Sequence, residues 1–192
     1  MNRRSAITSK ENIKKAALEV FSKYGYGGAS MRMIANEAGI SVGGLYLYFK
    51  NKEELCLFLI KEKLDEFSEL TENAFKDIED PVDAIGRYIN MSIEYAKKHS
   101  EFIITQSREQ GFTFGMDVKR KFFESQKALI VKIVQKGIEK GIFRSVEPSE
   151  VTKVIMGLIR GFIISIVIDP EDTFDARYCI DLILKGLLKE NG

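Results

Sequence analysis

The chain has 192 residues, of which 45% are hydrophobic and 30% charged, so it can build a sizeable core and stay soluble. These proportions exclude intrinsic disorder and a collagen-like fold. Residues 154–168 form the longest apolar stretch, but Arg160 interrupts it and it is short for a bilayer, so we expect no membrane span. The basic N-terminus is followed by no apolar block, which argues against a secretory signal and favours a cytoplasmic protein.

Few residues are available for redox, metal or acyl-transfer chemistry. The chain has two cysteines, Cys56 and Cys179, and a single histidine, His99, without a Cys/His cluster. It contains no GxxxxGKS loop, no GxSxG turn and no HExxH pair. The sequence therefore predicts a protein that is not an enzyme and that uses no cofactor or metal.

The net charge of +1 hides an asymmetry between the two parts of the chain. Residues 1–52 carry nine Lys and Arg and three acids, a surplus of six positive charges, whereas residues 53–192 carry 20 bases and 25 acids. A basic segment joined to a mildly acidic one is typical of a nucleic-acid-binding domain attached to another domain. We therefore place a domain boundary between residues 52 and 53.

Apolar residues recur at helical spacing along nearly the whole chain, which predicts an all-α fold of about nine helices. The first helix has one apolar stripe, with Thr8 and Glu11 at capping-box spacing at its start and Gly25 as the residue that ends it. The expected helices cover residues 9–24, 31–38, 42–49, 51–75, 81–98, 100–110, 114–141, 148–168 and 173–189.

Residues 31–50 fit a helix-turn-helix, in which two short helices cross through a tight turn. Ala35 must be small because the second helix passes over it, and Gly39 must adopt the conformation that ends the first helix. The inward-facing residues of the motif are Ile34, Ala38, Ile40, Leu45 and Tyr48. A short helical hairpin can serve packing alone, but its place in the basic part of the chain favours DNA binding. Tyr48 is expected in the core, and Tyr46 on the opposite face.

Three features of this segment resemble the TetR family of transcriptional regulators. They are the I-A-x-x-A-G turn, the L-Y-x-Y-F recognition helix and the N-K-E-E-L start of the fourth helix, all within ASMRMIANEAGISVGGLYLYFKNKEEL, residues 29–55. The segment KAALEVFSKYGYGGAS precedes them. The resemblance implies an N-terminal three-helix DNA-binding domain, residues 1–52, and a helical effector-binding and dimerisation domain, residues 53–192.

The resemblance also implies which residues contact DNA. Ser30 and Arg32 match phosphate-binding positions, Ser41 begins the recognition helix, and Tyr46 and Lys52 match further phosphate contacts. The full set is Ser30, Arg32, Ser41, Val42, Gly43, Gly44, Tyr46, Leu47 and Lys52.

The recognition helix departs from the common family pattern at three positions. Val42 replaces a frequent lysine, Leu47 a frequent histidine, and Gly44 a frequent threonine or serine. Because these changes remove side-chain donors, base readout is expected to rest on Arg32, Ser41, an apolar contact from Val42 to a thymine methyl, and backbone groups.

In the larger domain, the resemblance implies an effector cavity among the fourth to seventh helices, with mostly apolar walls and a few polar anchors. The candidate effector residues are Tyr88, Met91, Tyr95, Phe102, Gln106, Phe123 and Gln126, although core packing explains the aromatic ones equally well.

The last two long helices are expected to pair two protomers through a four-helix interface, since one reading module covers too little DNA for useful specificity. Gly157 and Gly161 allow close helix approach. The predicted interface residues are Gly157, Arg160, Gly161, Ile164, Ile180, Ile183, Leu184 and Leu187. The alternative is that the eighth helix is the central core helix of a monomer.

The sequence therefore predicts a homodimeric repressor that is released from a pseudo-palindromic double-stranded operator by a small, largely apolar effector, with no membrane partner. The alternative is a sequence-tolerant DNA-binding protein without a ligand switch.

Overall fold

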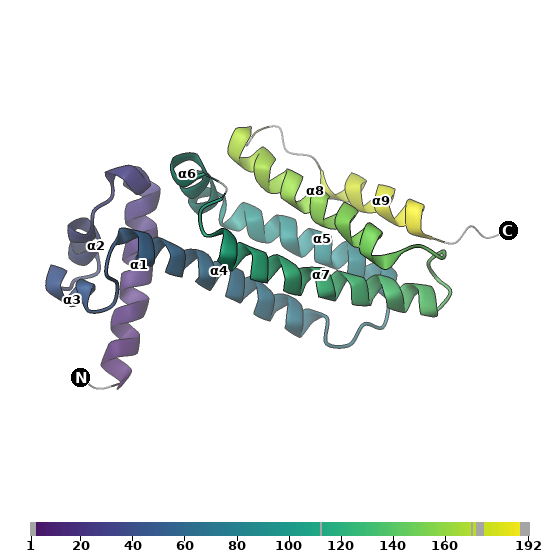
Figure 1. Ribbon diagram of the computed structural model, residues 1–192, viewed down its shortest axis with the longest axis horizontal. Coiled ribbons are helices and arrows are strands. Elements are labelled where there is room, and N and C mark those ends of the chain that lie inside the picture. Colours follow the sequence, from purple (N-terminus) through teal and green to yellow (C-terminus); the bar gives the residue numbers. More distant parts are fainter. Residues whose placement is uncertain (1–2, 112, 170, 172–174, 189–192) are drawn as a thin grey trace. The chain divides into compact units, whose positions relative to one another are not determined.

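The structure is a computed structural model that describes residues 3–111, 113–169, 171 and 175–188 (Figure 1). Within these residues the chain forms nine α-helices, and its one β-type contact is an isolated bridge between Phe143 and Leu188. The predicted all-α fold is therefore confirmed. The helices are α1 (Arg3–Gly28), α2 (Met31–Glu37), α3 (Val42–Tyr46), α4 (Lys52–Ala74), α5 (Pro81–Lys98), α6 (Ser100–Gln110), α7 (Met116–Glu139), α8 (Pro148–Ile168) and α9 (Ala176–Leu187).

Most helix bounds lie close to the sequence prediction, and the main differences concern α1 and α3. Helix α1 begins at Arg3, so Thr8 lies inside it and the expected cap there is wrong. Gly25 has a left-handed φ of 70° and a non-helical conformation, so the first helical segment ends there as predicted, and a further helical turn beyond this kink extends α1 to Gly28. Helix α3 ends at Tyr46, three residues before the expected end at Phe49.

The chain divides into two compact units, which we describe separately. The N-terminal unit comprises residues up to 64 together with 101–118, and the C-terminal unit comprises 65–100 and the residues from 119 onward. Helix α4 contributes residues to both units. The predicted domain boundary after residue 52 was based on the charge distribution and the helix-turn-helix motif, whereas these units reflect packing. The predicted boundary therefore stays a prediction.

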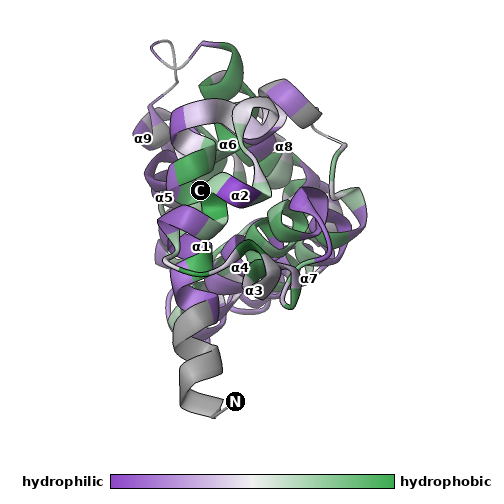
Figure 2. Cartoon of the chain, turned by 90° about the vertical axis from the view of Figure 1, so that its left-hand side faces the viewer, coloured by the Kyte–Doolittle hydropathy of each residue, from purple (hydrophilic) through white to green (hydrophobic). Residues whose placement is uncertain are grey.

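The core of the N-terminal unit forms around the apolar stripe of α1, whose hydrophobic and hydrophilic residues alternate around the helix (Figure 2). Ile13 and Ala17 of this stripe are fully buried. They belong to one cluster with Ile34 of α2, Leu45 of α3 and Leu55 of α4, which are fully buried as well. The two hairpin helices, α2 and α3, therefore share one core with α1 and the start of α4, and this core holds α3 in place.

The C-terminal unit is a helical bundle in which α5 packs against both α8 and α9 (Figure 1). One face of α5 is buried along its whole length, including Ile85, Tyr88 and Ile93. Asp80 caps this helix by accepting hydrogen bonds from the N–H groups of Val82 and Asp83, and Pro81 supplies the first helical position.

Helix α8 is the one helix of the described chain that is long and apolar enough to cross a membrane by length and composition. Its length of 21 residues therefore does not exclude a span, contrary to the expectation from residues 154–168. In the bundle, however, Ile155, Ile159 and Phe162 are buried against the chain's own helices. A buried core helix of a soluble protein has the same composition.

Candidate DNA interface and effector site

The helix-turn-helix has the geometry that its sequence requires. Ser30 caps α2, because its hydroxyl accepts a hydrogen bond from the Met33 N–H at 3.2 Å. Ala35 is fully buried, and its carbonyl accepts the Ile40 N–H at 3.0 Å, which closes the turn. Gly39 adopts a left-handed φ of 67°, where a side chain is strained. The expected roles of Ala35 and Gly39 are confirmed.

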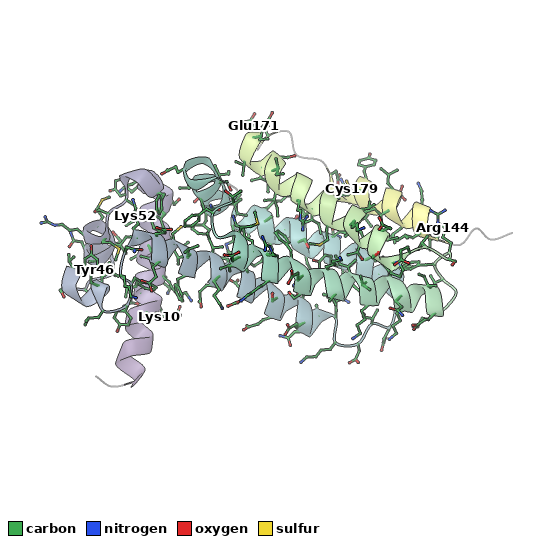
Figure 3. The ribbon with its side chains drawn as sticks, in the orientation of Figure 1. Lys10, Tyr46, Lys52, Arg144, Glu171 and Cys179 are labelled. Atoms are coloured by element: carbon green, nitrogen blue, oxygen red, sulfur yellow. The ribbon has the colours of Figure 1, made fainter. Side chains whose placement is uncertain are left out.

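Helix α3 is short and presents an apolar surface to solvent. Ser41 caps it by accepting the Gly44 N–H at 3.0 Å. Tyr46 projects outward from α3 (Figure 3), with 51% of its surface exposed, and the following Leu47 is 81% exposed. Gly43 is exposed and has no neighbouring atom within 4 Å of where a Cβ would lie. These residues form a surface that a DNA groove can approach closely.

Two residues of the motif face inward. Val42 is half-buried against the core of the N-terminal unit, which reduces the surface it can offer to a thymine methyl. Tyr48 is half-buried as well, and within the described chain its buried hydroxyl has no hydrogen-bond partner. The expected opposite orientations of Tyr46 and Tyr48 are confirmed, whereas the DNA contacts themselves stay predictions.

The two predicted phosphate-binding cations differ in orientation. Arg32 is exposed on α2. Lys52 is half-buried and its ammonium donates hydrogen bonds to the carbonyl oxygens of Tyr26 and, at 2.9 Å, of Ala29 (Figure 3). The ammonium also lies 4.2 Å from the centroid of the Tyr26 ring. Lys52 is thus engaged by backbone acceptors of its own unit.

Helix α6 belongs to the N-terminal unit, which the sequence did not suggest. Glu101 accepts a hydrogen bond from the Ser22 hydroxyl at 2.8 Å, and Glu109 accepts the N–H of Gly27 beyond the kink in α1. Two predicted effector residues lie in this unit. Phe102 packs against its core, and the amide of Gln106 donates to the Gly111 carbonyl at 3.2 Å.

In the C-terminal unit, three polar side chains from three helices meet in an otherwise apolar interior. The amide oxygen of Gln126 in α7 accepts the Tyr88 hydroxyl of α5 at 3.2 Å and lies 3.3 Å from the Thr71 hydroxyl of α4. All three residues are at most 3% exposed. We call Thr71, Tyr88 and Gln126 the polar triad. Sequence reasoning found two of its members and missed Thr71, because a threonine inside a helix is ordinary.

Aromatic rings surround the polar triad. The Phe67 and Phe75 rings lie 6.5 and 6.1 Å from that of Tyr88, and Phe67 also contacts Tyr95 and Phe122 at 5.0 and 6.0 Å between centroids. Burial raises the pKa of the Tyr88 hydroxyl well above its ordinary value. Burial and the neighbouring Glu66 carboxylate raise the pKa of Tyr95 in the same direction. Both hydroxyls are therefore neutral hydrogen-bonding groups at neutral pH.

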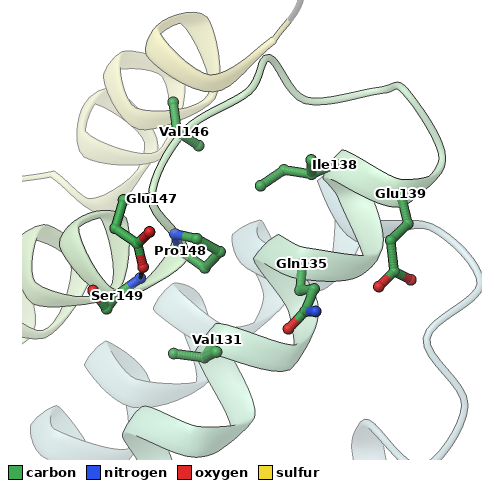
Figure 4. A pocket seen from close by; sticks show the side chains of 8 residues that line it. All are labelled: Val131, Gln135, Ile138, Glu139, Val146, Glu147, Pro148 and Ser149. Atoms are coloured by element: carbon green, nitrogen blue, oxygen red, sulfur yellow. Dashed lines mark hydrogen bonds between the residues drawn. The ribbon is translucent and has the colours of Figure 1, made fainter.

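The remaining predicted effector residues of this unit, Met91 and Phe123, are half-buried. The Arg160 guanidinium lies 4.5 Å from the centroid of the Phe123 ring. A surface groove of about 440 Å³ lies elsewhere, between the end of α7 and the start of α8 (Figure 4). None of the predicted effector residues lines that groove, which is bordered by Gln135, Glu139 and Glu147 among others.

Helices α8 and α9 leave apolar side chains in solvent within the described chain. Ile164 is 41% exposed, Gly157 is exposed, and Gly161, Ile180, Ile183 and Leu184 are half-buried. Leu187 is buried in its own chain, so it has little surface left for a partner. Further apolar residues of these helices are exposed and extend the surface of the predicted interface residues: Val154, Ile168, Tyr178 and Leu182.

A capped hairpin with an exposed second helix, in a chain that also forms a separate helical bundle, is the arrangement of helix-turn-helix regulators. The comparisons agree. The family described as bacterial regulatory proteins, tetR family, matches residues 13–57. The HTH-type transcriptional regulator YerO of Bacillus subtilis, described as uncharacterized, is 26% identical over 93% of this chain and 63% of its own length. The fatty acid metabolism regulator protein of the same species is 31% identical over 66% of both chains.

Solved structures share the fold along nearly the whole chain. FadR from Bacillus subtilis, in complex with stearoyl-CoA, matches 92% of this chain and 96% of its own, with a TM-score of 0.72 and 23% identity. A TetR transcription regulator from Haloarcula marismortui matches 94% of this chain and 98% of its own, with a TM-score of 0.81 and 20% identity. The chain belongs to the TetR family of transcriptional regulators.

Proposed function

We propose that this protein is a cytoplasmic, homodimeric repressor that binds a pseudo-palindromic operator and is released from it by a small, largely apolar effector. The observation that carries the proposal is the combination, in one chain, of an exposed recognition helix and a buried polar triad enclosed by aromatic rings. The first can read DNA, and the second can orient a ligand that is mostly apolar.

The effector class that the interior suits best is a long acyl chain with a carbonyl group. Phe67, Phe75 and Tyr95 offer apolar contacts, and the side chains of Tyr88 and Gln126 place polar groups among them. A side-chain amide can donate from its nitrogen while its oxygen accepts, so Gln126 could donate a hydrogen bond to a carbonyl oxygen of a ligand. The names of two relatives, a fatty acid metabolism regulator and a FadR bound to stearoyl-CoA, support the same class.

The proposed dimer uses the exposed apolar surface of α8 and α9. Val154, Ile164 and Leu182 are 62%, 41% and 72% exposed, which is unfavourable for a monomer in water. A dimer that binds a pseudo-palindromic operator needs its two recognition helices about 34–36 Å apart, one turn of B-DNA. The effector would act by favouring a state with another spacing, because a ligand that binds both states equally shifts nothing.

The test is selection of binding sites from random double-stranded DNA, followed by affinity measurements with and without palmitoyl-CoA, stearoyl-CoA or the free fatty acids. We expect an inverted repeat to be enriched and its affinity to fall at least about tenfold when an acyl compound is present. Gln126→Leu should keep operator binding and lose the response. Gln135→Leu, a change of the same type on an exposed part of α7, should keep both.

Binding that enriches no sequence, falls uniformly with salt and ignores every acyl compound would favour the sequence-tolerant binder without a switch. An enriched operator whose affinity no acyl compound changes would retain the DNA-binding half of the proposal and remove the effector class.

A further inference from the structure

The first residue of α4 has an unusual position for a cation. Lys52 stands at the N-terminus of its own helix, where the helix dipole disfavours positive charge and where Glu53 and Glu54 follow. Its side chain instead points to the C-terminal end of α1. There the ammonium donates to the Tyr26 and Ala29 carbonyl oxygens, in the last turn of α1 and just beyond it.

The surroundings of the ammonium explain this orientation. The last carbonyls of a helix lack intrahelical donors and carry the negative end of its dipole, so a lysine there is stabilised. The Tyr26 ring adds a cation–π contact at 4.2 Å, and this ring stacks on Phe21 of the core at 5.7 Å between centroids. The contacts of Lys52 therefore connect α4 to the packed interior of the N-terminal unit.

One of the two acceptors lies at a decisive place in the chain. Ala29 directly precedes Ser30, the cap of α2, so its carbonyl belongs to the connection that sets where the hairpin begins. We propose that Lys52 is a positioning residue: it ties the start of α4 to the connection between α1 and α2, and so fixes the orientation in which the hairpin presents α3. This differs from the phosphate contact that the family resemblance implies.

The inference rests on the proposed DNA binding, and two quantities separate the roles. A lysine that neutralises a phosphate contributes about 0.9 to the slope of log affinity against log salt concentration, and its loss weakens all sequences equally. A positioning residue leaves that slope unchanged, but its loss lowers the ratio between operator and unrelated DNA.

The experiment compares Lys52→Met, which keeps the aliphatic stem, with the wild type on the selected operator and on a scrambled duplex. Both proteins are measured over a series of salt concentrations, well below their melting temperatures. Lys50→Met is the matched control, because Lys50 lies two residues away and is exposed. Arg32→Gln serves as the reference for the loss of a surface cation. Lys52→Arg should restore most of the discrimination, since a guanidinium can reach the same carbonyls and ring.

We expect Lys52→Met to lower the operator-to-scrambled ratio at least about fivefold with an unchanged salt slope. A uniform loss on both duplexes, with a slope smaller by about 0.9 for each protomer, would overturn the proposal in favour of a phosphate contact. Unchanged discrimination in the folded variant would overturn it as well, leaving Lys52 a merely stabilising residue. If the wild-type protein selects no operator from random DNA, the proposed function itself fails. The proposed positioning role of Lys52 then fails with it.

Discussion

Replacing both Gly157 and Gly161 by alanine distinguishes the two roles that α8 can have. A Cβ added at either position of a single chain would meet no atom within 4 Å. Alanine is more favourable than glycine inside a helix by about 0.5–1 kcal/mol per residue. If this face of α8 stays in water, the double variant should therefore be more stable by about 1–2 kcal/mol.

In the proposed dimer the same methyl groups would meet the partner helix. Each dimer then carries four extra methyl groups at the closest approach of the helices, and overpacking of this kind costs about 1–3 kcal/mol. Because about 1.4 kcal/mol corresponds to a factor of ten, the dissociation constant of the dimer should rise by roughly five- to 150-fold.

Sedimentation equilibrium over a range of protein concentrations measures this constant, and thermal unfolding at the lowest concentration measures the stability of the separated chain. Gly43→Ala is the control, since it adds the same methyl group to a helix of the other unit, again with no atom within 4 Å. A double variant that is more stable and dimerises as tightly as the wild type would refute the reasoning and move the interface to another face.

Three further changes test separate parts of the molecule. Gly137→Ala should lower the free energy of unfolding by about 1–3 kcal/mol in a denaturant titration, because its Cβ would lie 2.1 Å from an atom of the buried Phe143 ring; an unchanged midpoint would show that the ring moves freely. If the exposed Leu47 contacts a thymine methyl, replacing that thymine by uracil should weaken wild-type binding and leave Leu47→Ala unaffected, whereas equal losses in gel-shift titrations would contradict the contact. Because burial raises the pKa of Tyr88, the unfolded chain loses this proton first, so stability should fall as pH rises above about 10. Tyr88→Phe should make that fall shallower in thermal melts, and an equal fall in both proteins would assign it to other groups.

The helix-turn-helix could be predicted from the sequence because its determinants are local. Ser30 and Ser41 cap the helices that follow them, and the turn depends on the one residue, Gly39, that can adopt its φ without strain. Each of these signals acts within three or four residues. The same holds for the start of α5, where Asp80 and Pro81 stand side by side.

The features that sequence reasoning missed depend on contacts between distant residues. The orientation of Lys52 depends on the path of the chain after the kink at Gly25. The sequence near residue 52 contains no pattern from which that path could be predicted. Likewise, the two carboxylates that attach α6 to the N-terminal unit reach Ser22 and Gly27 across about 80 positions of sequence. A residue such as Thr71 becomes significant only when two other helices bring polar groups to it.

The composition of the recognition helix makes such distant contacts important for DNA reading. Its exposed surface consists mainly of glycine backbone and the side chains of Tyr46 and Leu47, so it has few groups that can reach a base from a variable distance. Apolar contacts and backbone hydrogen bonds discriminate only when the helix lies at the right depth and angle in the groove, because they cannot adapt as a long arginine or lysine does. A reading surface of this kind therefore depends on whatever fixes the hairpin. In this chain those contacts are the buried Leu45, the two serine caps and the backbone hydrogen bonds of Lys52.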